Sequence, residues 1–162
     1  WVMNDDGSNP VNLTNFSAGP DCGVGSTDPT RTCRDSRPFW NGLILKYVYD
    51  ANHAGNSEIS TMLADGPGQT QIMTHADNDY EPKWSPSGNR IIFTGEPFGN
   101  DDVFIMNPDG TSVVSLTTNP GSDGGAVFVP RRTSHGGEAV TFRMAGQFLR
   151  GVRPIREPRV QM

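Results

Sequence analysis

One stretch decides the fold of this chain: residues 79–94, which read DYEPKWSPSGNRIIFT. Residues 81–84 form a short run that ends on Trp84, and SPSG at 85–88 is typical of a turn, because Pro favours the second turn position and Gly accepts a positive φ. Residues 90–94 carry β-branched and aromatic side chains, which favour a strand. The stretch therefore predicts two antiparallel strands joined by a tight turn.

The residues that follow predict two more strands. DVFIMN at 102–107 and SVVSLT at 112–117 are short apolar runs, and PDGT at 108–111 is a hairpin turn of the Asp-Gly kind. A solenoid of helix pairs is excluded, since Gly and Pro interrupt every segment before a long helix could form. Residues 79–117 are thus predicted to form four short antiparallel strands.

The same unit recurs along the chain. A shift of 44 residues brings 35–66 onto 79–110 without a gap and produces eight identities: Asp35/Asp79, Pro38/Pro82, Trp40/Trp84, Gly55/Gly99, Asn56/Asn100, Met62/Met106, Asp65/Asp109 and Gly66/Gly110. A second step of 44 opens another unit at Asp123, and a shift of 103 lays residues 1–14 on 104–117. The chain therefore holds half a repeat, two whole repeats and the front of a fourth.

Four strands in about 40–45 residues is the period of a β-propeller blade. The predicted fold class is all-β, with β-propeller-type four-stranded blades in an incomplete set of about three that forms an open arc, because a closed propeller has about four to eight blades. The predicted boundaries are 1–34 (the back half of a blade and an inserted loop), 35–78 and 79–122 (two blades), 123–142 (the start of a further blade) and 143–162 (a basic tail with no predicted structure).

Length and charge bound the function. The 162 residues, of which 34% are hydrophobic, suit one domain with a thin core. Residues 1–130 carry a net charge of −10, and residues 131–162 a net charge of +5. An acidic body argues against nucleic acid as the main partner, since phosphate neutralisation needs a basic face. No membrane span is predicted, because no apolar run approaches the roughly 18–20 residues that a spanning helix needs.

Residues 79–93 resemble the WD40-like repeat of the TolB type, whose blade opens with a Pro-x-Trp-Ser-Pro-Asp-Gly turn followed by a short Ile-x-Phe strand. Residues 106–117 are similar to the Asn-x-Asp-Gly-Ser…Leu-Thr ending of that repeat. The resemblance covers about residues 1–130 and departs from the pattern at 41–44 and at 128–131, where the Ser-Pro-x-Gly turn is replaced. After Pro130 the spacing of the repeat is lost.

The resemblance implies a ring of six or seven blades in a periplasmic, secreted or surface protein. Such a ring usually serves as a docking platform. In some relatives it is the gating propeller of prolyl-oligopeptidase-type serine peptidases or the body of a sugar-processing enzyme.

The repeated aromatic residues are predicted to form structural core. Trp40 and Trp84 recur at the 44-residue step, with Phe128 in the third copy, so packing between neighbouring sheets is favoured over an aromatic ligand platform. The Asp-Gly pairs are interpreted as turns rather than calcium loops, because no copy supplies the Glu that an EF-hand loop has at its twelfth position.

Acidic residues recur before each first strand and are predicted to lie on one rim of the propeller, near its channel. This rim consists of Asp35, Asp77, Asn78, Asp79 and Asp123. It could bind a cation or a basic partner. Alternatively, these side chains hold their turns by bonding to backbone amides.

Cys22 and Cys33 lie in the inserted loop between the first and second units. A zinc site would need two more ligands at short spacing, and none is present, so a disulfide is favoured. A disulfide implies an oxidising compartment, and the loop that it closes would project from one propeller face. The predicted localisation is therefore periplasmic or secreted.

No catalytic motif is found, so the chain is predicted not to be an enzyme and to need no cofactor or metal. His53, His75 and His135 do not recur with the repeat and are interpreted as solvated loop residues. The predicted function is a binding or scaffold module that presents loops to a protein or glycan, with self-association through unpaired blade edges as an additional contact. The alternatives are the propeller domain of a larger hydrolase or polysaccharide lyase, and a structural fragment without function.

Overall fold

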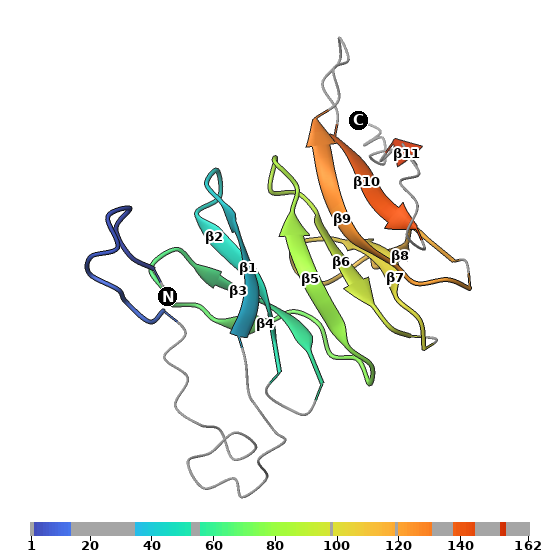
Figure 1. The fold of residues 1–162 in the computed structure, drawn as a ribbon, viewed down its shortest axis with the longest axis horizontal. Helices are drawn as coiled ribbons and strands as arrows, with labels where there is room; N and C mark the ends of the chain where they lie inside the picture. Colours follow the sequence, from blue (N-terminus) through green and yellow to red (C-terminus); the bar gives the residue numbers. More distant parts are fainter. Residues whose placement is uncertain are drawn as a thin grey trace, which may run out of the picture.

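The computed structural model describes residues 2–13, 35–52, 56–97, 99–118, 120–130, 138–144 and 153–154. These residues form three antiparallel sheets, and none of them lies in a helix long and apolar enough to cross a membrane (Figure 1). The first sheet has the order β1 (Asp35–Asn41), β2 (Lys46–Ala51), β3 (Glu58–Leu63) and β4 (Thr70–Gln71). The second has the order β5 (Asp79–Trp84), β6 (Ile91–Gly95), β7 (Asp102–Met106) and β8 (Val114–Ser115).

The third sheet consists of β9 (Asp123–Pro130), β10 (Glu138–Met144) and β11 (Arg153–Pro154), with β10 in the centre. Figure 1 shows the three sheets following one another, with β5 and β9 side by side. The prediction of an all-β open arc of blade-type sheets is confirmed.

Strand register repeats with the sequence. Trp40 pairs with Tyr47 in the first sheet, and Trp84 pairs with Ile91 in the second, each pair shifted by 44 residues. Both inner strands also carry a bulge at the same place, between Ser36 and Phe39 and between Tyr80 and Lys83. The 44-residue repeat is therefore a repeat of backbone geometry.

The loss of spacing after Pro130 has a local cause. Phe128 pairs with Val140, twelve residues on, whereas the equivalent Trp84 pairs with Ile91, seven residues on. The third hairpin is thus five residues longer than the second, and its strands still pair. β10 reaches Met144, and β11 lies within the segment for which the sequence predicts no structure.

The N-terminal hairpin matches the outer pairing of the second sheet. Val2 and Val11 make an antiparallel bridge that corresponds, at a shift of 103, to the pairing of Ile105 with Val114. Leu13 then packs on the first sheet against a cluster of Tyr49, Ala51 and Met62.

Neighbouring sheets enclose the core. Between the first and second sheets lies a cluster with Val48, Ile59, Met73, Trp84, Ile91, Phe93 and Met106. A smaller cluster, built from Ile92, Val103, Ile105 and Ala126 with Phe128 beside it, joins the second sheet to the third. Apolar burial between successive sheets therefore holds the arc together.

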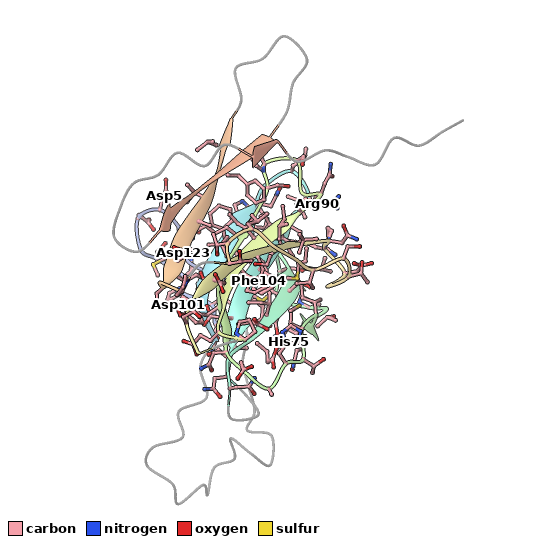
Figure 2. The ribbon with its side chains drawn as sticks, turned by 90° about the vertical axis from the view of Figure 1, so that its right-hand side faces the viewer. Asp5, His75, Arg90, Asp101, Phe104 and Asp123 are labelled. Atoms are coloured by element: carbon pink, nitrogen blue, oxygen red, sulfur yellow. The ribbon has the colours of Figure 1, made fainter. Side chains whose placement is uncertain are left out.

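Hydrogen bonds fix the start of two inner strands, β5 and β9. The backbone N–H of Asp79 donates to Ser57 O at 2.7 Å, and that of Asp123 donates to Asp101 O at 2.7 Å. Figure 2 shows Asp101 and Asp123 close together at this end of the sheets. Asn56 and Asn100 each donate through Nδ2 to the linker that leads to the next sheet, which explains why this Asn recurs.

The three repeated aromatic residues have different surroundings. Trp84 is buried between two sheets, and Phe128 packs partly buried against the second sheet. Trp40 is 41% exposed and contacts Tyr47, with ring centroids 4.8 Å apart. Trp40 is therefore only partly covered, whereas the sequence pattern predicts burial between two sheets.

Candidate ligand site between the first and second sheets

The predicted acidic rim is not a ring of exposed carboxylates. Asp35, Asp79 and Asp123 begin β1, β5 and β9, so their backbones lie at corresponding strand ends. Asp79 and Asp123 are buried, at 3% and 0% exposure. Asn78 is tied into the fold, since its Oδ1 accepts from Ser57 N at 3.0 Å. Of the four rim residues whose side chains the structure describes, Asp77, Asn78, Asp79 and Asp123, only Asp77 is exposed.

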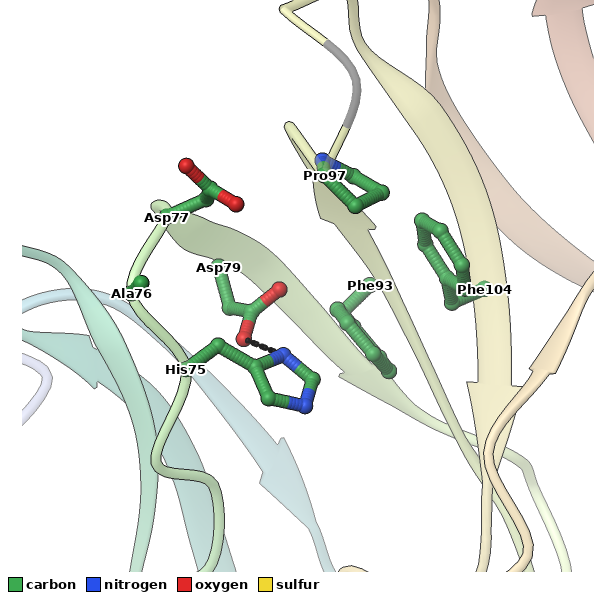
Figure 3. A pocket seen from close by; sticks show the side chains of 7 residues that line it. All are labelled: His75, Ala76, Asp77, Asp79, Phe93, Pro97 and Phe104. Carbon is green, nitrogen blue, oxygen red and sulfur yellow. Dashed lines mark ion pairs between the residues drawn. The ribbon is translucent and has the colours of Figure 1, made fainter.

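A cavity of about 240 Å³ opens where the linker from the first sheet enters β5. Figure 3 shows the seven residues that line it: His75, Ala76, Asp77, Asp79, Phe93, Pro97 and Phe104. Two predicted rim residues, Asp77 and Asp79, thus meet at one site, whereas Asp123 does not line it. The cavity combines an acidic side with an apolar side.

Asp79 supplies the buried carboxylate of this cavity. Its Oδ2 lies 2.9 Å from Nδ1 of His75, four residues earlier in the linker (Figure 3). This ion pair is the one polar contact of Oδ2 among the described residues. The carboxylate is therefore incompletely compensated.

Burial raises the pKa of Asp79 to about 6. His75 opposes this shift, whereas the carboxylates of Glu58 and Asp77 add to it. Glu58 lies behind the site on β3, 5% exposed, and its Oε1 accepts from Asn56 Nδ2 and His75 N, each at 2.8 Å. Two further carboxylates and one imidazole therefore act on the Asp79 carboxylate.

Phenylalanine rings form the apolar wall. The rings of Phe93 and Phe104 stack with centroids 5.4 Å apart and planes inclined at 20°. Gly95 makes room for this arrangement, since a Cβ at that position would lie 2.6 Å from Asp79 Oδ1 and 3.3 Å from Phe104 Cε2. A side chain at Gly95 would therefore displace both sides of the site.

Sequence reasoning missed His75 and Phe104 as site residues. His75 is half-exposed in the linker, but its position four residues before Asp79 was a readable signal. Phe104 occupies the position that Ser60 has in the preceding unit. A residue that departs from the repeat in this way is a signal that the position has a role specific to its own unit. His53, His135, Cys22 and Cys33 lie outside the described residues.

A second depression, of about 260 Å³, lies at the opposite end of the inner strands and includes Trp40, Lys83 and Phe128. Burial lowers the pKa of Lys83, and Glu81 opposes this shift. Within the described part of the chain, no group of three or more His, Cys, Asp or Glu side chains is arranged to hold a metal ion. The first cavity remains the site where a buried charge and an apolar wall converge.

Solved β-propellers share this fold. A candidate TolB from Agrobacterium tumefaciens matches with a TM-score of 0.53 and 19% identity, over 75% of this chain and 42% of that chain. TolB from Acinetobacter baumannii matches with a TM-score of 0.50 and 18% identity, over 74% of this chain and 31% of that chain. No protein-family model and no curated protein matches the sequence.

These matches show that the chain has the fold of part of a TolB-like β-propeller. The chain spans less than half the length of either structure.

Proposed function

We propose that this chain is a non-catalytic binding module of a propeller, and that a partner protein docks on the rim where the first and second sheets meet. The observation that carries the proposal is the cavity between His75, Asp79 and Phe104. A concave, largely apolar site with a few convergent polar groups and a perturbed carboxylate is the usual form of a binding site.

The electrostatics of the chain favour a basic partner. Residues 1–130 carry a net charge of −10, and Asp77 stands exposed at the mouth of the cavity. Charge complementarity of this kind steers association and selects against acidic partners. A glycan is the other partner class considered. Its hydroxyl groups carry no positive charge, so it would gain less binding energy than a basic protein from contact with the Asp79 carboxylate.

We further propose that the module acts outside the cytoplasm, in the periplasm or after secretion. This rests on the predicted pairing of Cys22 with Cys33, since disulfides persist in oxidising compartments. Thiol titration of the native, unreduced protein would detect two free thiols if the pairing were absent.

A peptide-display selection tests the docking role. Peptides that bind the immobilised chain are expected to lose about tenfold or more in affinity for Asp77→Lys, because the substitution places a cation at the cavity mouth. Asp5→Lys is the matched control, since it makes the same charge change in the N-terminal hairpin. Peptides that bind both variants and the original chain equally would contradict docking at this rim.

A further inference from the structure

The cavity between the first and second sheets holds more negative charge than its surroundings neutralise. Asp77 and Asp79 line the cavity, and Glu58 on β3 adds a negative charge that acts on Asp79. Among the described residues that line the cavity, only His75 can carry a positive charge. The Asp79 side chain is 5% exposed, so water compensates its charge poorly. A cation that entered the cavity would supply the missing counter-charge.

The opposite wall suits a hydrocarbon stem. Phe93 is 1% exposed and belongs to the core, so its ring is held in place, and Phe104 stacks on it. Pro97 closes the same side (Figure 3). A ligand with methylene groups behind a cationic head could therefore lie along the rings while its head reached the Asp79 carboxylate.

We propose that this cavity binds a basic side chain of a partner protein, with its ammonium or guanidinium group on Asp79 and its methylene stem against Phe93 and Phe104. The inference rests on the proposed function and deepens it by assigning the chemistry of the contact. A free alkylamine shares this chemistry, so small amines serve as probes of the site.

Departures from the repeat support this assignment. At the next junction, the positions equivalent to His75 and Asp77 are Asn119 and Gly121, and in the preceding unit Ser60 replaces Phe104. The Asp at the start of the inner strand recurs in each unit. The charged and aromatic residues around Asp79 do not recur. The fold of the repeat therefore does not require this combination, which is specific to one junction.

An NMR titration of the full chain with n-butylammonium, n-butylguanidinium and 1-butanol tests the proposal. At pH 7.5, one or both cations are expected to shift the amide signals of residues 75–79 in a saturable way. The neutral alcohol is expected to bind at least about tenfold more weakly, since it lacks the charge. Equal binding of the alcohol, or no saturable shift with either cation, would overturn the proposal.

Matched variants locate the contact. Asp79→Asn preserves the shape of the side chain and is expected to weaken cation binding by about tenfold or more, whereas Asp5→Asn removes the same charge from the distant hairpin at 2–13 and is expected to leave binding unchanged. If Asp79→Asn did not fold, Asp77→Asn at the exposed mouth should still weaken binding about twofold to threefold. Undiminished binding in these site variants would overturn the proposal.

The pH dependence supplies a second readout. Since the pKa of Asp79 is about 6, the cation affinity should fall by about tenfold between pH 7.5 and pH 5 as the carboxylate takes up a proton. His75, Asp77 and Glu58 are the other ionisable groups that act on Asp79. An affinity that stayed constant over this range would contradict the assignment to Asp79.

The two proposals can fail separately. If displayed peptides bind at the rim but the alkyl cations do not enter the cavity, docking stands and the basic side-chain contact falls. If the cations bind through Asp79 but no peptide depends on Asp77, the cavity chemistry stands and docking by a protein falls.

Discussion

At the scale of single residues, Asp79 has an unfavourable position for a carboxylate. An Asp begins each of three inner strands, and at Asp79 the buried side chain is also subject to the negative charges of Asp77 and Glu58, which His75 opposes. A charged residue that costs stability and borders a cavity is typical of a functional site.

Replacing this carboxylate should stabilise the fold at neutral pH. The folded-state pKa of about 6 lies above the ordinary value of 3.8, so the folded protein binds this proton more tightly than the unfolded chain does. The resulting loss of stability is complete above pH 6 and disappears as the pH falls toward 3.8. Asp79→Asn is therefore expected to raise the free energy of unfolding by about 2–3 kcal/mol at pH 7.5.

Urea denaturation at pH 7.5 and pH 4.5 measures this effect. The gain should shrink to less than half at the lower pH, and Asp5→Asn, in the exposed hairpin, should stay within about 0.5 kcal/mol at both. A destabilised Asp79→Asn protein, or an equal gain at both pH values, would show that the carboxylate is not held in an unfavourable state.

At the scale of elements, the outer hairpins repeat one backbone conformation. Gly7, Gly66 and Gly110 have φ values of 81°, 99° and 82°. The residue two positions later is also left-handed in each copy, with φ values of 51°, 68° and 56° at Asn9, Gly68 and Ser112. In the second and third copies the glycine also meets the preceding unit: a Cβ on Gly66 would lie 2.9 Å from Leu13 O, and one on Gly110 would lie 2.0 Å from Ile72 O.

Gly7 has open space around it and Gly110 does not, so alanine variants at these two positions distinguish the cost of backbone strain from the cost of a clash between units. Gly7→Ala should cost about 1–2 kcal/mol, because alanine disfavours the left-handed conformation but has open space around it. Gly110→Ala carries the same strain and a backbone clash, so it should cost about 3 kcal/mol or more. Denaturation of the two variants compares them directly, and equal losses would mean that the contact with Ile72 does not hold the sheets in place.

At the scale of the whole molecule, the described sheets form an arc rather than a closed ring (Figure 1). The outermost strands β4, β8 and β11 have two residues each, so each sheet offers little edge for a further strand to pair with. In the described part of the chain, the first sheet leaves Trp40 with 41% of its surface exposed, so this side chain is available for contact.

Chromatography with light and X-ray scattering tests this shape. A monomer of 17.6 kDa should have a radius of gyration above the roughly 15 Å of a compact globule of this length, or the chain should elute at a multiple of that mass. Either result agrees with an arc whose end faces are exposed. A monomer with the radius of a compact globule would contradict it.

The 44-residue repeat was sufficient to predict the blade-type sheets. Strand register and hairpin geometry could be predicted because they depend on residues close in sequence, which recur with each unit. The prediction was poorest where the unit departs from its own pattern. The sequence showed that the spacing changes after Pro130, but neither the pairing of β9 with β10 across the longer hairpin nor the surroundings of Trp40 could be read from the repeat.

The sequence by itself determined the kind of sheet and how each pairs internally, since these rest on local turns and on alternation within a unit. Only the tertiary structure decided which side chains meet between units: His75 beside Asp79, Phe104 on Phe93, and Asp123 buried away from the cavity. The physical reason is that the charge and exposure of these groups depend on the facing sheet, and at this junction the facing residues are the ones that do not repeat.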